Sequence, residues 1–429
     1  MRNTSCILPA ILVSLVVFVS LQSRVFAQTN PNAVANITHQ TYPQVTVTVI
    51  SNYLYYAPYG PPNTLVYDIT NPTNPVYLAN TSIPGQAGNA AYLYGCLPIA
   101  VAGRYAYVAS SDLSVVDISN PTNLLTVGAW HSDIGPSNSI GIATALDVAV
   151  SGNYVYLADG CDGLYVFDVS IPARLIQVGH TNDLGAPTDQ PSYAFGYEGS
   201  AVGVAVSGNY AFVANWLDGL RVYDVSNPSH PVNVGRVADP AYSITISGGL
   251  AYVFTARGAV NIYGLSDPSH PMLVGQITGW ALGSLALSGN FVFVDSVFQS
   301  VSIYDVSNPA HPLQVGHTDD LSGPGGWAYE AYSIALSHNY LYVGLRDYGV
   351  RIYALGSPSP PKLSITITNT SNLLLSWPAP TSAFVAQQNS GINSANWLTL
   401  TNESALVGPQ NQVTIPKPPG SMFYRLVSR

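Results

Sequence analysis

One stretch of the sequence decides the fold: Leu220-Arg-Val-Tyr-Asp-Val-Ser-Asn-Pro-Ser-His-Pro231. It recurs in altered form along most of the chain, and an internal repeat of this kind determines the architecture before any local feature does. Each copy is anchored on the residue that closes its third apolar run. The anchors are Asp68, Asp117, Asp168, Asp224, Gly264, Asp305 and Ala354, which gives seven copies.

Each copy has the pattern of four short antiparallel strands. In the fourth copy, apolar and polar residues alternate over 204–214, 220–224 and 232–237. A Ser-Gly-Asn turn divides the first of these runs into two, and Asp-Gly and Asn-Pro turns separate the three runs. Such alternation indicates strands. A single four-stranded sheet cannot bury both of its faces, so the copies must stack around an axis. The sequence therefore predicts an all-β protein, with a seven-bladed β-propeller over residues 28–356.

A closed ring must cover the edge strands where its two ends meet. Residues Ala33–Thr38 resemble the strand that ends other copies, such as Pro231–Arg236, yet they precede the first copy. We expect them to form the outer strand of the last blade. The alternative is that Lys362–Ile365 fills this position.

The third apolar runs resemble a known repeat. Leu113-Ser-Val-Val-Asp117, Leu164-Tyr-Val-Phe-Asp168 and Leu220-Arg-Val-Tyr-Asp224 are each followed by Val or Ile, Ser and a proline turn. This pattern is similar to the LVIVD repeat of bacterial secreted β-propellers, over roughly residues 33–361. The resemblance implies the fold and little chemistry. The departures at Gly264 and Ala354 argue against a functional ring of aspartates, and we expect each anchor Asp to accept N–H groups of its own turn.

The first 27 residues have the features of a secretory signal peptide. They contain Arg2, an apolar run from Ile7 to Val19, and Val25-Phe-Ala27 as a cleavage site. The run is too short for a membrane span, so we expect a secreted protein in the periplasm, at the cell surface or outside the cell. The net charge of −9 disfavours nucleic acid as a partner, and we expect a monomer.

Two cysteines follow the signal peptide, Cys96 and Cys161. In a propeller blade, the segment that enters the innermost strand and the hairpin between the second and third strands lie on the same face. Cys96 precedes the inner strand of the second copy, and Cys161 lies in that hairpin of the third. We expect a disulfide between them in an oxidising compartment; two free buried thiols are the alternative.

Extra chain separates some copies, always between the outermost strand of one copy and the innermost strand of the next. Long loops gathered on one face of a repeat scaffold are the usual place for a binding site. We therefore expect the ligand of this protein to bind on that face. The four insertions are Asn80–Leu97, His131–Ala145, His180–Ala201 and His317–Tyr332.

Aromatic side chains in or near these loops are the candidate ligand contacts. They offer flat apolar area beside amide and acidic groups, which suits a sugar or a peptide. Packing of the loops onto the blades explains them equally well. These residues are Tyr193, Tyr197, Trp216, Trp280, Trp327 and Tyr329.

Acidic residues near the start of three loops suggest a cation site, because carboxylate oxygens suit calcium. Capping of local turns explains the same pattern and is favoured, so we expect no cofactor. The spacing for zinc is also missing from the sequence. The acids concerned are Asp133, Asp183, Asp319 and Asp320.

A second domain is expected after the proline-rich linker 357–361. Residues 362–429 alternate as strands of a small β-sandwich, with Trp377 and Trp397 as core anchors. The Leu-Ser-Trp-Pro and Phe-Tyr-Arg-Leu motifs at its two ends resemble fibronectin-III-like modules of secreted bacterial proteins. This resemblance implies a role in attachment, export sorting or substrate contact.

The sequence favours a non-catalytic binding or interaction protein whose ligand is an extracellular glycan or protein. The alternative is an enzyme, a hydrolase or lyase, that acts on extracellular polysaccharide with loop carboxylates. A glycosidase needs two carboxylates about 5–10 Å apart. The two candidates, Glu198 and Glu330, belong to the fourth and seventh copies, almost across the ring. This separation argues against catalysis by the pair.

Overall fold

The computed structural model of the chain is built of strands. It describes residues 31–38, 45–58, 64–81, 98–109, 112–131, 145–160, 162–181, 200–255, 258–279, 284–296, 300–318, 331–345, 349–355, 363–368, 372–378, 384–390, 396–400, 405–407, 410–418 and 422–428. No residue in these ranges is helical, as the alternating pattern predicts. The same ranges therefore contain no helix that is long and apolar enough to cross a membrane.

Residues 33–354 form seven four-stranded antiparallel sheets within the described ranges, which we number 1 to 7 in chain order. Sheet 1 contains β2 (Val45–Ile50), β3 (Tyr53–Pro58), β4 (Thr64–Asp68) and β5 (Val76–Thr81). Sheet 2 contains β6 (Ile99–Ala102), β7 (Tyr105–Ala109), β8 (Leu113–Asp117) and β9 (Leu125–Trp130). Sheet 3 contains β10 (Asp147–Ser151), β11 (Tyr154–Ala158), β12 (Leu164–Asp168) and β13 (Ile176–Thr181). Sheet 4 contains β14 (Gly203–Ser207), β15 (Tyr210–Ala214), β16 (Leu220–Asp224) and β17 (Val232–Val237).

The remaining three sheets of this region repeat the same order. Sheet 5 contains β18 (Ala241–Ser247), β19 (Leu250–Thr255), β20 (Val260–Gly264) and β21 (Met272–Ile277). Sheet 6 contains β22 (Leu285–Ser288), β23 (Phe291–Ser296), β24 (Ser300–Asp305) and β25 (Leu313–His317). Sheet 7 contains β26 (Ala331–Ser337), β27 (Tyr340–Leu345), β28 (Gly349–Ala354) and the N-terminal β1 (Ala33–Ile37).

The N-terminal strand completes the last sheet. β1 pairs antiparallel with β28, with Ile37 opposite Val350 and Asn36 opposite Arg351. The prediction for residues 33–38 is thus confirmed. The alternative was wrong, because residues 364–367 form β29, which pairs with β30 (Asn372–Pro378) of a separate sheet.

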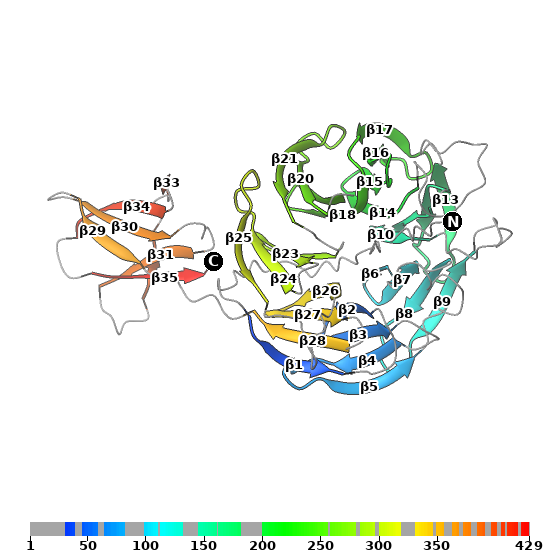
Figure 1. The fold of residues 1–429 in the computed structure, drawn as a ribbon, viewed down its shortest axis with the longest axis horizontal. Coiled ribbons are helices and arrows are strands. Elements are labelled where there is room, and N and C mark those ends of the chain that lie inside the picture. The colour runs from blue at the N-terminus through cyan, green and yellow to red at the C-terminus, as the bar shows by residue number, and fades with distance from the viewer. Residues whose placement is uncertain are drawn as a thin grey trace, which may run out of the picture.

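Neighbouring sheets share hydrophobic clusters. The cluster between sheets 3 and 4 contains Tyr156 and Val166 of sheet 3 with Val213 and Tyr223 of sheet 4. Comparable clusters join each consecutive pair, and one of them joins sheet 7 to sheet 1. The sheets therefore follow one another around a ring, as Figure 1 shows. This arrangement covers the faces that a single sheet would leave bare.

The innermost strands carry a larger side chain on one face and a small one on the other. In β10, Val148 packs into the cluster shared with sheet 2, and Ala149 packs against the cluster shared with sheet 4. Innermost strands converge toward the axis, which leaves little volume for the second face. The residues equivalent to Ala149 are Thr48, Ala100, Ala205, Thr245, Ala286 and Ala335.

Glycines in the outermost strands allow close contact with the next sheet. A Cβ atom at Gly235 in β17 would overlap the carbonyl oxygen of Ser269, in the proline turn of sheet 5. Gly179 and Gly275 face the carbonyl oxygens of Pro228 and Pro309 in the same way. The glycine of the repeat is therefore required by packing between neighbouring sheets.

The anchor aspartates hold the turns that follow the third strands. The carboxylates of Asp168 and Asp224 accept the backbone N–H groups of Ser170 and Ser226, both at 2.8 Å. These hydrogen bonds lower the pKa of both carboxyls. The predicted structural role of the anchor Asp is confirmed at these positions, and Asp68, Asp117 and Asp305 make the same bond.

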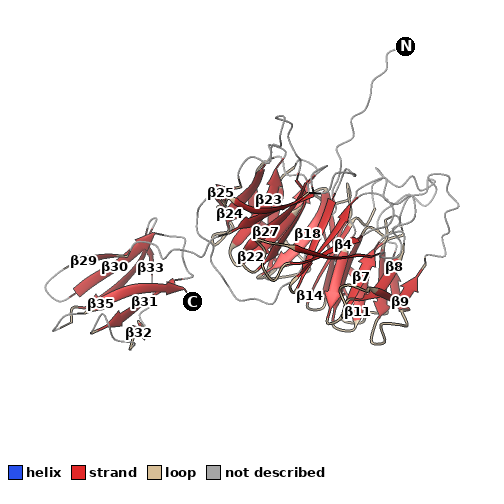
Figure 2. Ribbon diagram, turned by 90° about the horizontal axis from the view of Figure 1, so that it is seen from below, coloured by secondary structure: helices blue, strands red, loops and turns tan. Residues whose placement is uncertain are grey.

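The C-terminal residues form two further sheets (Figure 2). The two sheets share one hydrophobic cluster. One sheet contains β29 (Ser364–Ile367), β30 (Asn372–Pro378), β34 (Gln410–Pro416) and β33 (Ala405–Val407). The other contains β32 (Leu398–Thr399), β31 (Phe384–Asn389) and β35 (Phe423–Ser428). Trp377 lies in the cluster, as predicted, and is 2% exposed. Trp397 is half-buried instead, with the Arg425 guanidinium 4.2 Å from its ring centroid.

Candidate functional site on the hairpin face of sheets 3 and 4

All long connections between sheets begin and end on the same face of the ring. In a four-stranded antiparallel sheet, the start of the first strand, the hairpin between the second and third strands and the end of the fourth lie at one edge. We call this edge the hairpin face. The connections after β5, β9, β13 and β25 therefore leave from it and return to it. The connecting residues 82–97, 132–144, 182–199 and 319–330 lie outside the described residues.

Most site residues predicted from the sequence lie in these connections and stay predictions. Outside the described residues are the aromatic residues Tyr193, Tyr197, Trp280, Trp327 and Tyr329 and the carboxylates Glu198 and Glu330. The same holds for the cation candidates Asp133, Asp183, Asp319 and Asp320, for Cys96 and Cys161, and for the signal peptide 1–27.

Trp216 is the predicted ligand contact that the structure describes. It lies in the hairpin 215–219 of sheet 4, is 8% exposed and belongs to the hydrophobic cluster between sheets 4 and 5. Its ring meets that of Tyr242 edge to face, with centroids 4.4 Å apart. Contact of Trp216 with a ligand stays a prediction, and its burial favours the packing explanation.

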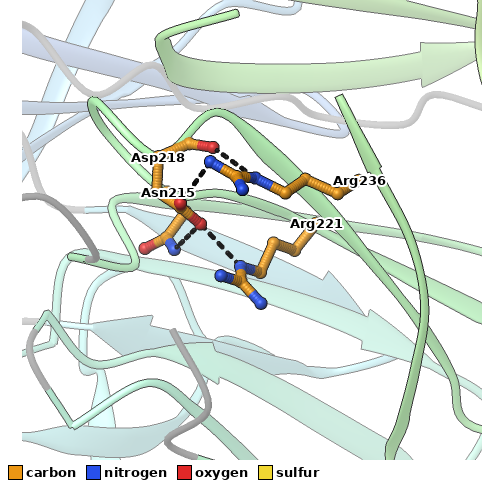
Figure 3. Close-up of polar contacts among 4 residues, drawn as sticks. All are labelled: Asn215, Asp218, Arg221 and Arg236. Carbon is orange, nitrogen blue, oxygen red and sulfur yellow. Dashed lines mark hydrogen bonds and ion pairs between the residues drawn. The ribbon is translucent and has the colours of Figure 1, made fainter. Parts of the chain in front are cut away.

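The same hairpin holds a polar cluster of four residues (Figure 3). Asp218 accepts a hydrogen bond from Arg221 Nε at 2.6 Å and pairs with Arg236 Nη2 at 2.5 Å. Arg236 Nε also donates to the backbone oxygen of Asp218 at 3.1 Å, and Asn215 Nδ2 donates to its carboxylate at 3.2 Å. One carboxylate therefore holds two guanidinium groups, which leaves a local excess of one positive charge.

The backbone of this hairpin is fixed in several ways. Asn215 N donates to Gly219 O at 2.7 Å, and Ala241 N of sheet 5 donates to Trp216 O at 2.8 Å. Trp216 has φ of 47° and Gly219 has φ of 96°, both in the left-handed region. A side chain at Gly219 would overlap Val237 O. The buried indole and these contacts hold Asp218, and through it the two arginines, in place.

Aromatic rings line the equivalent position of sheet 3. The His180 ring stacks on Tyr165, with centroids 4.1 Å apart, and its Nε2 lies 2.6 Å from Asp162 O. Trp130, at the end of β9 in sheet 2, packs against Tyr165 with centroids 5.0 Å apart. Tyr165 is 7% exposed and lies with Trp130 at the cluster between sheets 2 and 3, so these rings pack one sheet against the next.

The histidines that open three of the long connections each have a partner nearby. His131 Nδ1 lies 2.8 Å from Asp112, and His317 Nδ1 lies 2.7 Å from Thr318 O. His180 bonds within its own sheet. Groups of three or more His, Cys, Asp or Glu that could hold a metal ion do not occur among the described residues.

The sequence did not point to Asp147, the first residue of β10. Its Oδ2 accepts Val204 N of sheet 4 at 2.9 Å, and its Oδ1 accepts Val148 N at 2.8 Å. Burial raises the pKa of this carboxyl to about 7, against the opposing effect of these two hydrogen bonds. Two serines at the same position bridge other sheets: Ser284 accepts Ile334 N at 3.1 Å and Ser333 accepts Val47 N at 3.0 Å.

The fold and the repeated contacts define the class of protein. Stacked four-stranded antiparallel sheets, joined by shared clusters, are the architecture of a propeller-like repeat protein. The LVIVD repeat model matches residues 98–131, 143–183, 198–239, 240–278, 282–320 and 325–368, more than half of the chain. The chain therefore belongs to the LVIVD repeat family. The first copy lies outside these matches, although its residues form sheet 1.

Two solved structures resemble this one at low sequence identity. The computationally designed Ika8 protein has a TM-score of 0.48 and 10% identity, over 77% of this chain and 100% of its own. A functionally unknown protein from Desulfotomaculum acetoxidans DSM 771 has a TM-score of 0.49 and 12% identity, over 66% of this chain and 87% of its own. No curated protein matches the chain in sequence. At this level of similarity neither structure bears on the function.

Proposed function

We propose that this chain is a secreted, non-catalytic binding protein that recognises an extracellular glycan on its hairpin face. One observation carries the proposal: all the long connections join strand ends on that face, and they contain most of the aromatic residues predicted as ligand contacts. Binding sites on repeat scaffolds typically form where such connections gather. Flat rings with few polar anchors suit sugars.

The proposal includes the finer architecture. We infer a seven-bladed propeller, closed by β1, followed by a small fibronectin-III-like β-sandwich over residues 362–429. Seven sheets with a shared cluster between sheet 7 and sheet 1 support the blade number. The cluster common to both C-terminal sheets supports the sandwich. The secretory signal over residues 1–27 and a Cys96–Cys161 disulfide complete the proposal.

A glycan array tests the function directly. The purified full chain is expected to bind a subset of glycans, and Trp327→Ala is expected to weaken that binding with no change in thermal stability. Incubation with a polysaccharide panel is expected to release no products. Product release that depends on Glu198 or Glu330 would contradict the proposal and support the enzymatic alternative.

A further inference from the structure

We propose that Arg221 and Arg236 form a subsite for the carboxylate group of an acidic sugar residue. This inference rests on the proposed glycan-binding function and names the chemical class of the ligand. Both residues lie at the hairpin face of sheet 4, and their guanidinium groups meet at Asp218 (Figure 3).

The two arginines lie directly opposite each other, which is unfavourable by itself. β16 and β17 pair with Arg221 in register with Arg236, and like charges in such a cross-strand pair destabilise a sheet. The equivalent pairs in other sheets avoid this: they are Tyr165 with His180, Asn261 with Gln276, Ser302 with His317, and Arg351 with Asn36. A pair of permanent cations therefore distinguishes sheet 4 from these four sheets.

The pair has hydrogen-bond donors available for a ligand. Each guanidinium carries five N–H donors in a planar fork. The bonds to described residues use Nε of Arg221 and use Nε and Nη2 of Arg236. Among those bonds, none uses the Nη groups of Arg221 or Nη1 of Arg236. The Arg236 side chain is 49% exposed, so a ligand can reach it.

The donors are also held in a fixed geometry. The Arg221 side chain is 15% exposed and that of Asp218 is 12% exposed, so both are confined by the surrounding protein. Asp218 itself belongs to the rigid hairpin described above. Binding of an oxyanion here costs little side-chain entropy, because the arginines are already ordered in the free protein. A planar carboxylate fits the planar guanidinium edge bidentately.

The charge balance favours a single carboxylate over a polyanion. Two guanidinium groups and one carboxylate leave one excess positive charge, whereas the whole chain carries −9. A dense polyanion would be repelled by the rest of the surface. Because this inference rests on the proposed glycan binding, we assign the carboxylate to a sugar, and an acidic peptide is the other source that the test below distinguishes.

Calorimetric titration of the full chain tests the subsite with three probes. These are an oligosaccharide that carries one glucuronate, the same oligosaccharide with glucose in its place, and a glutamate-containing peptide. We expect the acidic oligosaccharide to bind roughly tenfold more tightly than the neutral one. Arg236→Gln is expected to remove this difference, and Arg236→Lys, which keeps the charge and loses the planar fork, is expected to reduce it.

Arg351→Gln is the matched control, because Arg351 occupies the same register position on β28. It is expected to leave the affinity for all three probes unchanged. Equal binding of the acidic oligosaccharide by the wild type and Arg236→Gln would overturn the subsite, while retained binding of the neutral probe would leave the proposed function intact. If neither oligosaccharide binds, both the subsite and the proposed glycan-binding function are overturned. If the peptide binds more tightly than the acidic oligosaccharide and this binding depends on Arg236, the assignment of the ligand as a sugar is overturned.

Discussion

The carboxylate of Asp147 accepts the backbone N–H of Val204 at 2.9 Å, across the boundary between sheets 3 and 4. Ser284 and Ser333 make the equivalent bond at the boundaries between sheets 6 and 7 and between sheets 7 and 1. Side chains at one position of the innermost strand therefore join neighbouring sheets at these three boundaries. At the boundary between sheets 3 and 4, the bridging group is the buried carboxyl of Asp147, whose pKa is raised by burial to about 7.

The first prediction concerns pH and the boundary between sheets 3 and 4. In the folded chain, burial raises the pKa of the Asp147 carboxyl from its ordinary value of 3.8 to about 7. Folding therefore binds a proton between these values, so stability falls as pH rises from about 4 to about 7 and then levels off. Asp147→Ser keeps a hydroxyl acceptor and removes the charge. We expect the variant to gain stability relative to the wild type over this window, by roughly 4 kcal/mol at most.

Thermal unfolding of both proteins at a series of pH values measures this difference. The histidines and the other acids titrate alike in both proteins, so their effects cancel. Parallel curves of Tm against pH would contradict the prediction.

The second prediction concerns the glycine of the outermost strand. Gly235→Ala places a Cβ against the carbonyl oxygen of Ser269, which lies in the proline turn of sheet 5, while Gly235 itself lies in the ladder of β16 and β17. We expect a loss of about 1–3 kcal/mol in the free energy of unfolding. Gly279→Ala is the control, because a Cβ there meets no atom within 4 Å. Equal stability of the two variants in denaturant unfolding would show that the close approach does not matter.

The third prediction concerns the strand that completes sheet 7. Ile37 of β1 is 6% exposed and packs in the cluster between sheets 7 and 1. Ile37→Asp buries an unpaired charge, and we expect it to cost roughly 3 kcal/mol or more and to release β1. Val34→Asp is the comparison, because Val34 is 37% exposed on the same strand. Limited proteolysis is expected to cleave the N-terminal segment of Ile37→Asp and to spare Val34→Asp, and equal cleavage of both would count against this role of β1.

The fourth prediction concerns the carboxylate between the two arginines. Asp218→Asn removes the charge that holds Arg221 and Arg236 together and leaves two cations in register. Because the site is partly exposed, we expect a modest loss of about 1–2 kcal/mol. Adding Arg236→Gln to this variant is expected to restore part of the loss, since it removes the repulsion. Chemical unfolding of the single and double variants measures both changes in the free energy of unfolding. High salt is expected to reduce the difference between the two variants, because it screens the repulsion between the arginines.

The sequence predicted the strands of sheets 1 to 7 because each copy consists of short runs of strand-forming residues, as in 204–214. Turn residues separate these runs, and Asn-Pro turns mark the ends of the third ones. The anchor Asp could be assigned to its turn from the sequence, because its partner lies two residues away, as Ser226 does for Asp224. Local contacts of this kind leave a pattern that can be read along the chain.

The candidate site was harder to predict, because its residues meet only through the sheet register. Arg221 and Arg236 are ordinary surface residues in the sequence, and their pairing with Asp218 depends on the hairpin and on the bulge in β17. Trp216 was a candidate ligand contact with packing as the equal alternative, and its indole lies in the cluster between sheets 4 and 5. Asp147 was not singled out from the sequence, because its role requires the neighbouring strand β14.

The sequence by itself determined the repeat and the strand order within each copy, and it favoured the N-terminal segment as the origin of the last strand. These properties follow from the period of apolar residues and from turns whose hydrogen bonds are local. Only the tertiary structure decided which side chains bridge neighbouring sheets and which cations share a carboxylate. The bridging contacts join residues that are far apart in the chain, and the shared carboxylate depends on the register of β16 and β17, so both exist only in the folded sheets.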